Sequence, residues 1–356
     1  MLQSHSIQRQ TERLALHLTT VGVVPSTQRV HAPGRVNLIG DHTDYTGGLV
    51  FPMAIDRGTT IEFVPDDTTI ALRSDADDDP IRLDVPVTET PAAVIPRWGS
   101  YVAAMAVELG SRTGIRGHVT STIPAGAGLS SSAALECAVG LALGFDGSPV
   151  ELAQAAQRAE HAATGVPTGI MDQLCIASAL RGTATLIDCH TLSVSHVTVP
   201  DDVEVVVRFV AHRTLVGSAY GDRVAECRAA ESVLGPLRSS TPDAVEAAEL
   251  GELVRRRARH VVTENQRVLD FADALRHGRY DTAGALMVQS HRSLASDFDT
   301  STPAMDRAVD DLVRSPGVFG ARMTGGGFGG CVVALCRPGA LDDGWVVSAS
   351  DGARRL

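Results

Sequence analysis

The stretch Gly34-Arg-Val-Asn-Leu-Ile-Gly-Asp-His-Thr-Asp-Tyr-Thr-Gly-Gly48 carries the strongest signal in this chain. Its arginine, histidine, tyrosine, two aspartates and four glycines make it too polar for a protein core. Apolar runs at 36–39 and 49–55 enclose the polar residues, so we expect a loop between two buried strands. Loops fixed on a rigid scaffold often carry binding residues. A solvated turn would account for Thr46-Gly47-Gly48 taken alone, but the whole stretch favours a functional loop.

Length and composition narrow the class of protein. The 356 residues are enough for two domains of roughly 100–200 residues each, and 44% hydrophobic with 21% charged residues is typical of a globular protein. The net charge of -11 argues against a nucleic-acid partner and an anionic membrane surface. No run approaches the ~20 apolar residues of a membrane span. Polar residues interrupt segment 14–24, which lacks a signal-peptide cleavage site, so we expect a cytoplasmic protein.

The cysteines are scattered and form no CxxC pair. Most lie among apolar residues, as in Cys331-Val-Val-Ala-Leu-Cys336, so we expect reduced core residues. A metal clip at Cys331 and Cys336 would need a second cysteine or histidine pair, which the sequence lacks. The six are Cys137, Cys175, Cys189, Cys227, Cys331 and Cys336.

Hydrophobic periodicity predicts a mixture of strands and helices in both halves of the chain. Strands are expected at 31–39, 49–55, 59–64, 117–123, 185–188, 203–210 and within 318–335. Helices are expected within 1–28 and at 98–109, 133–143, 149–163 and over most of 220–300, with a linker at 234–242. The acidic segment 66–79 is expected as a solvated turn region. This order predicts a two-domain α+β protein with a boundary near residues 190–205.

A second glycine-rich stretch, Pro124-Ala-Gly-Ala-Gly-Leu-Ser-Ser-Ser-Ala-Ala134, joins a predicted strand to a predicted helix. Gly126 and Gly128 permit turns that other residues avoid. Ser130, Ser131 and Ser132 then present hydroxyls and backbone N–H groups at a helix start, where an anion is favoured. The glycine spacing fits neither a Walker A loop nor a dinucleotide fingerprint. The stretch is typical of a nucleotide-phosphate cradle, although a simple helix N-cap would also account for it.

Three further features carry candidate chemistry. Asp172 follows a turn shaped by Pro167 and Gly169, and its carboxylate is a candidate base toward a hydroxyl; locally, a helix cap is the simpler interpretation. Glu160, on the preceding helix, is a candidate Mg²⁺ ligand together with a serine hydroxyl, or a solvated side chain. The loop Met323-Thr-Gly-Gly-Gly-Phe-Gly-Gly330 has glycines that favour close approach of a ligand or another loop.

Together these stretches resemble the GHMP small-molecule kinases and, among them, the galactokinase family. Gly34 to Tyr45 is similar to the galactokinase signature, 124–134 to the phosphate motif of the GHMP kinases, and Gly169-Ile-Met-Asp-Gln173 to their catalytic segment. Ser290-His-Arg-Ser-Leu294 and 322–331 resemble the C-terminal motifs. The similarity runs through nearly the whole chain in the same order.

The resemblance implies a fold and an activity. It implies an N-terminal domain of the ribosomal S5 type, at 1–197, and a ferredoxin-like C-terminal domain, at 198–356, with the active site between them. It also implies ATP-dependent, Mg²⁺-assisted phosphorylation of the C1 hydroxyl of galactose. We expect a monomer with a small-molecule sugar substrate.

The resemblance assigns roles to particular residues. Asp172 would be the catalytic carboxylate and Arg35 its cationic partner, while Ser131 or Ser132 with Glu160 would hold Mg²⁺. The glycines and serines of the phosphate motif would bind ATP, and Trp98 would pack on adenine; a core position is the alternative for Trp98. The sugar hydroxyls would be bound by Asp41, His42, Asp44, Gly169 and Tyr220.

One position departs from the galactokinase pattern in a way that bears on the substrate. Asp41 stands where these kinases usually have glutamate, whose carboxylate reaches the C6 hydroxyl of the sugar. The shorter side chain keeps a second hypothesis open, a sugar-1-kinase for an arabinose-like or C6-modified galactose. A third is a sugar- and ATP-sensing regulator without catalysis, which Arg35, Asp172 and the uninterrupted serines 130–132 argue against.

Overall fold

The computed structural model describes residues 26–212 and 219–356. The expected helix within 1–28 falls almost entirely outside these ranges. The strands are β1 (Gln28–Ile39), β2 (Leu49–Asp66), β3 (Thr69–Ser74), β4 (Asp77–Asp84), β5 (Gly114–Ser121), β6 (Thr183–Asp188), β7 (Ser193–Thr198), β8 (Glu204–Ala211), β9 (Val318–Met323), β10 (Gly330–Cys336), β11 (Trp345–Val347) and β12 (Arg354–Arg355). The α-helices are α2 (Trp98–Glu108), α3 (Ser131–Ala142), α4 (Pro149–Thr164), α5 (Met171–Ser178), α6 (Tyr220–Leu234), α7 (Pro242–Ala247), α8 (Glu252–Arg276), α9 (Tyr280–Ser296) and α10 (Pro303–Arg314).

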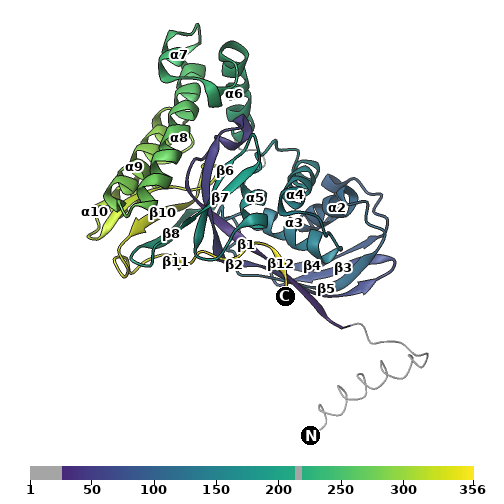
Figure 1. Ribbon diagram of the computed structural model, residues 1–356. Coiled ribbons are helices and arrows are strands. Elements are labelled where there is room, and N and C mark those ends of the chain that lie inside the picture. Colours follow the sequence, from purple (N-terminus) through teal and green to yellow (C-terminus); the bar gives the residue numbers. More distant parts are fainter. Residues whose placement is uncertain (1–25, 213–218) are drawn as a thin grey trace, which may run out of the picture.

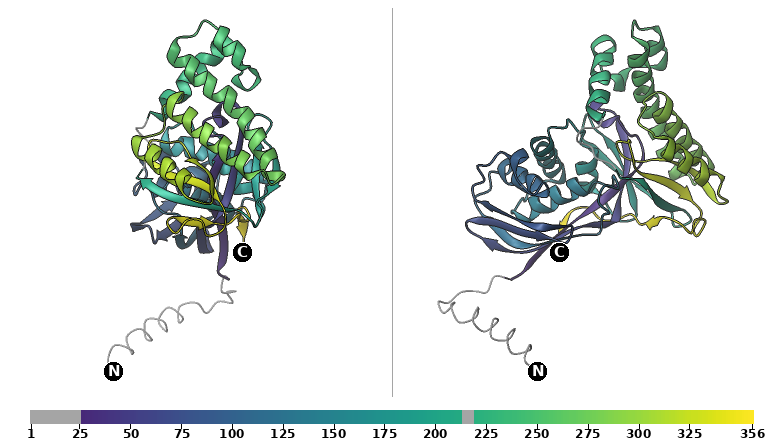
Figure 2. Two further views of the ribbon diagram at one scale, coloured as in Figure 1. Left: turned by 90° about the vertical axis from the view of Figure 1, so that its left-hand side faces the viewer. Right: turned by 180° about the vertical axis from the view of Figure 1, so that it is seen from behind.

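Two sheets with helices packed against them confirm the two-domain α+β prediction (Figure 1). The N-terminal sheet has eight strands in the order β12-β1-β2-β5-β3-β4, with β6 pairing the start of β2 and β7 pairing β6. Helices α2, α3, α4 and α5 pack on this part of the molecule (Figure 1). The C-terminal sheet has the order β11-β8-β10-β9 and is covered by α9 and α10, while α8 packs on α9 and against β1 and β2 (Figure 2).

Local sequence signals fix several boundaries as expected. Ser148 begins α4 with a reciprocal capping box: its hydroxyl accepts from the backbone N–H of Glu151, whose carboxylate accepts from the backbone N–H of Ser148. Pro149 occupies the first turn, where its missing N–H costs nothing. The six cysteines are free and buried, as predicted.

The prediction of a turn region at 66–79 is wrong for most of that segment. β3 and the start of β4 form an antiparallel hairpin there, with Leu72 opposite Ile81. The acidic side chains of β4 are largely exposed, and β4 is the last strand of its sheet. Charged residues at a sheet edge discourage pairing with another chain, so the acidic run is compatible with a strand at this position.

The chain returns to its first sheet at its C-terminal end. β12 pairs with β1 through Val30 opposite Arg355, and Ala349 bridges Ile55 of β2. The larger apolar core also contains residues of both halves; within it the rings of Phe51, on β2, and Phe271, on α8, meet edge to face at 5.7 Å. The two halves therefore share one packed interior.

Candidate active site

A pocket of about 440 Å³ brings together every residue that the sequence singled out for binding or catalysis. It is lined by residues of both halves, with β1, the loop before α3 and the N-terminal end of α5 on one side and Tyr220 and Gly326 from the C-terminal half. The predicted residues in its wall are Arg35, Asp41, His42, Asp44, Trp98, Gly126, Gly128, Ser130, Ser131, Ser132, Glu160, Gly169, Asp172 and Tyr220.

Arg35 and Asp172 form a bidentate ion pair in this pocket. Arg35 Nε donates to Asp172 Oδ1 at 2.7 Å and Nη2 donates to Oδ2 at 2.8 Å. The arginine side chain is only 4% exposed whereas that of Asp172 is 28% exposed, so the carboxylate is the partner that reaches the solvent side. Burial by itself would lower the pKa of Arg35, but the charges of Asp172 and Asp41 raise it. The pair fixes the position of the carboxylate.

Asp172 does not cap α5, so the local interpretation of this residue is wrong. Ile170 occupies the N-cap position, and Asp172 lies in the first turn with its side chain turned to Arg35. The hydroxyl of Ser130 also donates to Asp172 Oδ2. The predicted phosphate loop, residues 124–134, and the candidate catalytic carboxylate are therefore directly connected.

The phosphate loop has the backbone geometry of a cradle. Gly126, Gly128 and Ser130 all have positive φ, at 70°, 76° and 62°, immediately before α3. Two hydrogen bonds attach this loop to β1. Arg35 Nη1 donates to Gly128 O at 2.8 Å, and the backbone N–H of Arg35 donates to Leu129 O at 3.1 Å. The backbone N–H groups at the start of α3 are thus presented next to Arg35 and Asp172.

Glu160 is buried and meets Ser132 in the pocket wall. Ser132 Oγ donates to Glu160 Oε1 at 3.0 Å, while Thr168 Oγ1 and Gln173 Nε2 donate to Oε2 at 3.0 and 2.9 Å. The solvated alternative for Glu160 is therefore wrong. Two neutral donors hold one oxygen, which leaves Oε1 and the serine hydroxyl as hard oxygen ligands facing the pocket. A pair of oxygen ligands completed by substrate phosphates is a common protein environment for Mg²⁺.

A second carboxylate, Glu136, lies behind this pair and has no exposed surface. Burial, and then the charge of Glu160, raise the pKa of Glu136 well above its usual range. Gln173 Nε2 lies 3.3 Å from Glu136 Oε2, so one amide connects the two acids. Glu136 and Gln173 were not predicted as functional; a glutamate four residues after Ser132 on an otherwise apolar helix was the signal available.

Asp44 is packed against Gly169. A Cβ at position 169 would lie 1.9 Å from Asp44 Oδ2, so only glycine fits there. Burial and the neighbouring charge of Asp172 raise the pKa of Asp44 to about 7. The structure thus places a poorly compensated carboxylate beside the Arg35 and Asp172 pair.

Aromatic side chains enclose the pocket near His42. The His42 ring lies 5.4 Å from that of Tyr220 and 4.8 Å from that of Phe298. His42 Nδ1 is 3.0 Å from the Tyr45 hydroxyl and Nε2 is 3.3 Å from Gly326 O in the glycine-rich loop. This arrangement fixes the imidazole plane and connects the N-terminal signature to the C-terminal half.

Trp98 lies at another part of the pocket wall, at the start of α2. Its indole N–H donates to Asp79 O at 3.2 Å, and its ring packs against the edge of the core. A ring that is half-buried and lines the pocket can both pack against the core and present a face to a planar ligand.

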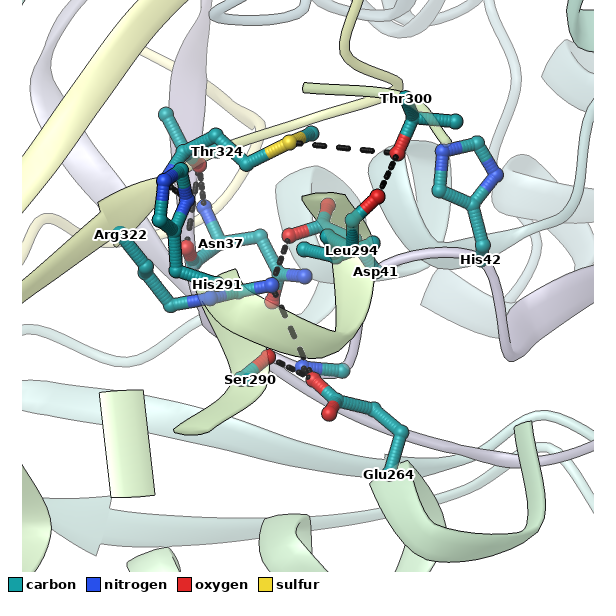
Figure 3. Close-up of polar contacts among 12 residues, drawn as sticks. Asn37, Asp41, His42, Glu264, Ser290, His291, Leu294, Thr300, Arg322 and Thr324 are labelled. Carbon is teal, nitrogen blue, oxygen red and sulfur yellow. Dashed lines mark hydrogen bonds and ion pairs between the residues drawn. The ribbon is translucent and has the colours of Figure 1, made fainter. Parts of the chain in front are cut away.

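Side chains of the C-terminal half bind the backbone of the signature loop, residues 34–48, and of the strands that flank it. Glu264 Oε1 accepts from the backbone N–H of Gly40 at 3.0 Å, and His260 Nε2 lies 3.2 Å from Asp41 O (Figure 3 draws part of this region). Asn265 Oδ1 accepts from the backbone N–H of Leu49 at 2.8 Å. These three side chains come from α8 at positions 260, 264 and 265, a spacing that puts them on one helix face.

The fourth contact comes from the loop after β9. Thr324 Oγ1 accepts from the backbone N–H of Asn37 at 2.9 Å and donates to Asn37 O at 3.0 Å (Figure 3). Asn37 lies opposite Pro52 of β2 in a pair whose backbone groups point away from that strand, so Asn37 needs a partner on its other side. Sequence reasoning missed Thr324, His260, Glu264 and Asn265; polar residues within the apolar face of a long helix were the only signal for the last three.

No helix among the described residues is long and apolar enough to cross a membrane. Within ranges 26–212 and 219–356, no three His, Cys, Asp or Glu side chains gather as a metal centre.

Family signatures and relatives match this chain along most of its length. The galactokinase galactose-binding signature matches residues 15–65, and the N-terminal and C-terminal domains of the GHMP kinases match 99–180 and 271–344. Galactokinase of Chloroflexus aggregans (strain MD-66 / DSM 9485) is 42% identical over 341 residues, which are 90% of this chain and 86% of that protein.

Solved structures agree with this assignment. The galactokinase of Lactococcus lactis, solved in complex with galactose, has a TM-score of 0.87 and 30% identity, covering 99% of this chain and 100% of that one. The mevalonate kinase of Methanococcus jannaschii has a TM-score of 0.65 at 21% identity, covering 88% and 92%, a likeness of fold alone. The chain belongs to the galactokinase family of the GHMP kinases.

Proposed function

We propose that this protein is a galactokinase, which transfers the γ-phosphoryl group of ATP to the C1 hydroxyl of galactose. The observation that carries the proposal is the bidentate Arg35 and Asp172 pair, placed in one pocket between the phosphate loop and the signature loop. A fixed carboxylate next to a phosphate cradle is what transfer to a hydroxyl requires, because catalysis of this reaction is mainly positioning and charge stabilisation.

In this mechanism Asp172 accepts a hydrogen bond from the C1 hydroxyl and receives its proton as the new P–O bond forms. Because the transition state is loose, the hydroxyl keeps its proton until late, and orienting the nucleophile is the larger part of the role of Asp172. Arg35 holds the Asp172 carboxylate through its bidentate contact and stabilises the negative charge on the phosphoryl group during transfer. Ser130 ties the carboxylate to the loop that holds the phosphates.

ATP would lie with its phosphates on the backbone N–H groups around Gly126, Gly128 and serines 130–132, and with its adenine against Trp98. Ser132 and Glu160 would hold Mg²⁺ through the two oxygens that face the pocket. The metal ion would neutralise charge on the β- and γ-phosphates when bound.

The sugar would occupy the part of the pocket lined by Asp41, His42, Asp44, Gly169 and Tyr220. Carboxylates are suited to pairs of sugar hydroxyls, and a sugar lacking one of them would leave a buried acceptor unpaired. Asp41 would read the C6 hydroxyl and Asp44 the hydroxyls nearer to Asp172. We expect a monomeric enzyme in the cytoplasm, with domains at 1–197 and 198–356.

ADP release with ATP and Mg²⁺ tests the proposal, using galactose, arabinose, 6-deoxygalactose, N-acetylgalactosamine and glucose as acceptors. Galactose is expected to give the highest kcat/KM. Asp172→Asn should lower kcat by about 10²–10⁴-fold, because the orienting acceptor is lost, while galactose still binds by calorimetry.

The matched control is Asp188→Asn. Asp188 also forms a bidentate pair, with Arg238 Nη1 and Nη2 at 2.7 and 2.8 Å, but it does not line the pocket. Its variant should keep the wild-type kcat. If the wild type binds galactose and ATP without turnover, the protein is a sugar-sensing regulator rather than an enzyme. If it prefers another sugar, that sugar is its substrate.

A further inference from the structure

The role of Arg322 is not explained by the proposed mechanism. This residue lies on β9 in the C-terminal half with no exposed surface. Its Nη2 atom is 2.8 Å from Asp41 Oδ2, and the Asp41 side chain is 1% exposed. Figure 3 shows the guanidinium group between Asp41 and Glu264. A fully buried ion pair thus joins the signature loop to a strand of the other domain.

The charges around Arg322 divide into two pairs. Glu264 Oε2 accepts from Arg267 Nε at 2.6 Å, whereas Glu264 Oε1 is 3.7 Å from Arg322 Nη2. The pKa of Glu264 is about 2, because the nearby cations outweigh its burial. Since Arg267 already balances Glu264, the charge of Arg322 is available to Asp41.

The hydrogen bonding of the Arg322 and Asp41 side chains is incomplete. The 2.8 Å contact between Arg322 Nη2 and Asp41 Oδ2 lacks hydrogen-bond geometry, and among the described residues no other group hydrogen-bonds the two carboxylate oxygens or the three guanidinium nitrogens. The buried Asn37 side chain lies near the carboxylate and lowers its pKa, although neither of its polar atoms has full hydrogen-bond geometry. Buried polar atoms are normally paired, so the open acceptor positions of the Asp41 carboxylate are suited to a ligand. Asp41 lines the pocket, whereas Arg322 and Asn37 lie behind it.

Burial raises the pKa of Asp41, and the charge of Arg322 opposes this shift. Removal of the arginine would leave an isolated carboxylate in a dry site, which would favour its neutral form or a different rotamer. The backbone of Asp41 is already fixed at its carbonyl by His260 and at the preceding N–H by Glu264. The direction of the side chain is the one variable that Arg322 controls.

We propose that Arg322 is a positioning residue for sugar specificity, which fixes the Asp41 carboxylate from the other domain so that it selects a sugar with a C6 hydroxyl. This inference rests on the proposed function. It accounts for the aspartate at position 41: a carboxylate held back against Arg322 lies just behind the pocket wall, where a water bound to the sugar hydroxyl can reach it and complete its hydrogen bonds.

The test compares galactose with 6-deoxygalactose, which differs only at C6. Arg322→Met should raise KM for galactose by about tenfold or more, leave kcat within about threefold, and leave kcat/KM for 6-deoxygalactose nearly unchanged. The ratio of the two kcat/KM values should therefore fall by about tenfold. Arg322→Lys should restore part of this selectivity because it keeps the charge. The KM for ATP should not change.

Arg257→Met is the matched control. Arg257 is 1% exposed and ion-paired with Glu226 at 2.7 Å, but it does not line the pocket or contact Asp41. Its loss should lower the thermal midpoint without changing the ratio between the two sugars. A parallel fall for both sugars in Arg322→Met, with the ATP KM rising as well, would mean that Arg322 only supports the fold and would overturn the inference.

Arg322→Met leaves a buried carboxylate unpaired and could fail to fold. The double variant Asp41→Asn/Arg322→Met removes both charges together and serves in its place. We expect it to match Asp41→Asn alone in KM and in sugar selectivity; a further loss of selectivity would contradict the positioning role. Wild-type protein that turns over neither sugar would contradict the proposed function itself, whereas an active wild type with an unaltered Arg322→Met contradicts only the role of Arg322.

Discussion

At the residue scale, the site is built from carboxylates whose environments differ. Asp172 is balanced by Arg35 and Asp41 by Arg322, each through a contact of 2.8 Å or less. Asp44 has no such cation among the causes of its shift: burial and the charge of Asp172 dominate. The three acids therefore face different charges, and we expect them to respond differently to substitution.

The raised pKa of Asp44 predicts a pH-dependent gain in stability for Asp44→Asn. Between its ordinary value of 3.8 and the folded value of about 7, the folded protein binds more protons at this site than the unfolded chain does. Its stabilising contribution is therefore lost as pH rises through 7. Relative to wild type, the free energy of unfolding of Asp44→Asn should rise by up to about 4 kcal/mol between pH 4 and pH 8, less where solvent screens the group.

Urea denaturation at several pH values measures this difference. Asp188→Asn provides a control of opposite sign, because hydrogen bonds from Arg238 lower the pKa of Asp188. Its contribution is present above the unfolded pKa and lost in acid, so that variant should be increasingly less stable than wild type as pH rises through about 4. A pH-independent difference between Asp44→Asn and wild type would show that Asp44 is already ionised in acid.

Gly169→Ala should disable sugar binding while leaving nucleotide binding intact. The new methyl group would lie 1.9 Å from Asp44 Oδ2, so that carboxylate must move from its place in the pocket. We expect the galactose affinity to fall by about 10–100-fold, equivalent to the loss of one or two good hydrogen bonds. Calorimetric titration with galactose and with ATP separates the two effects.

Gly251→Ala is the companion variant, since Gly251 has no atom within 4 Å of the added carbon and has an ordinary φ of -60°. Galactose affinity should be unchanged there. Undiminished galactose binding by Gly169→Ala would show that Asp44 is not part of the sugar site.

At the element scale, side chains of α8 and of the loop after β9 hydrogen-bond to the backbone of the signature loop and its flanking strands. α8 is the longest helix among the described residues, and its residues 260, 264 and 265 all bind N-terminal backbone or its flanks. Thr324 pairs with both backbone groups of Asn37, which point away from β2. Backbone groups buried at an irregular point of a sheet must find partners elsewhere, and the second domain provides them.

Thr324→Val therefore should destabilise the protein by about 2–4 kcal/mol, because an isosteric methyl leaves the backbone N–H and C=O of Asn37 unpaired. Chemical denaturation gives the change in the free energy of unfolding. Thr300→Val is the matched control: Thr300 is equally buried, but its hydroxyl is 3.5 Å from Leu294 O, a weak contact. An equal loss in the free energy of unfolding of the two variants would assign the effect to packing rather than to the hydrogen bonds between Thr324 and the Asn37 backbone.

At the scale of the whole molecule, the two domains share packing and pairing, and we expect them to unfold as one unit. The larger apolar core draws on both halves, β12 completes the edge of the N-terminal sheet, and Arg238 connects Asp188 with Gly47 O. Cutting the chain between the domains would expose apolar surface and unpaired backbone at once.

A fragment of residues 1–197 should therefore lack a cooperative unfolding transition, whereas the full chain should show a single one by circular dichroism and by calorimetry. The fragment loses the partners of Asn37, Gly40 and Leu49 and the strand that pairs with Val30. A soluble fragment with its own sharp unfolding transition would show that the N-terminal core folds without its contacts to the C-terminal domain.

The sequence by itself determined the fold class, the positions of most elements and the residues that converge in the pocket. Turn-forming glycines, the Ser148 cap and apolar periodicity act over a few residues, so local patterns reveal them. Asp172, Arg35 and Ser130 were identified by their motifs, and the structure brings all three within hydrogen-bond reach.

Only the tertiary structure decided which groups of the N-terminal domain pair with which groups of the C-terminal domain. Arg322 and Asp41 are 281 positions apart in the chain, and Thr324 and Asn37 are 287 apart, so no local pattern relates them. The same holds for the acidic run at β4, where position at a sheet edge decided that charged residues form a strand. Burial and partner choice depend on packing between distant segments, and these set the charge and direction of Asp41 and Asp44.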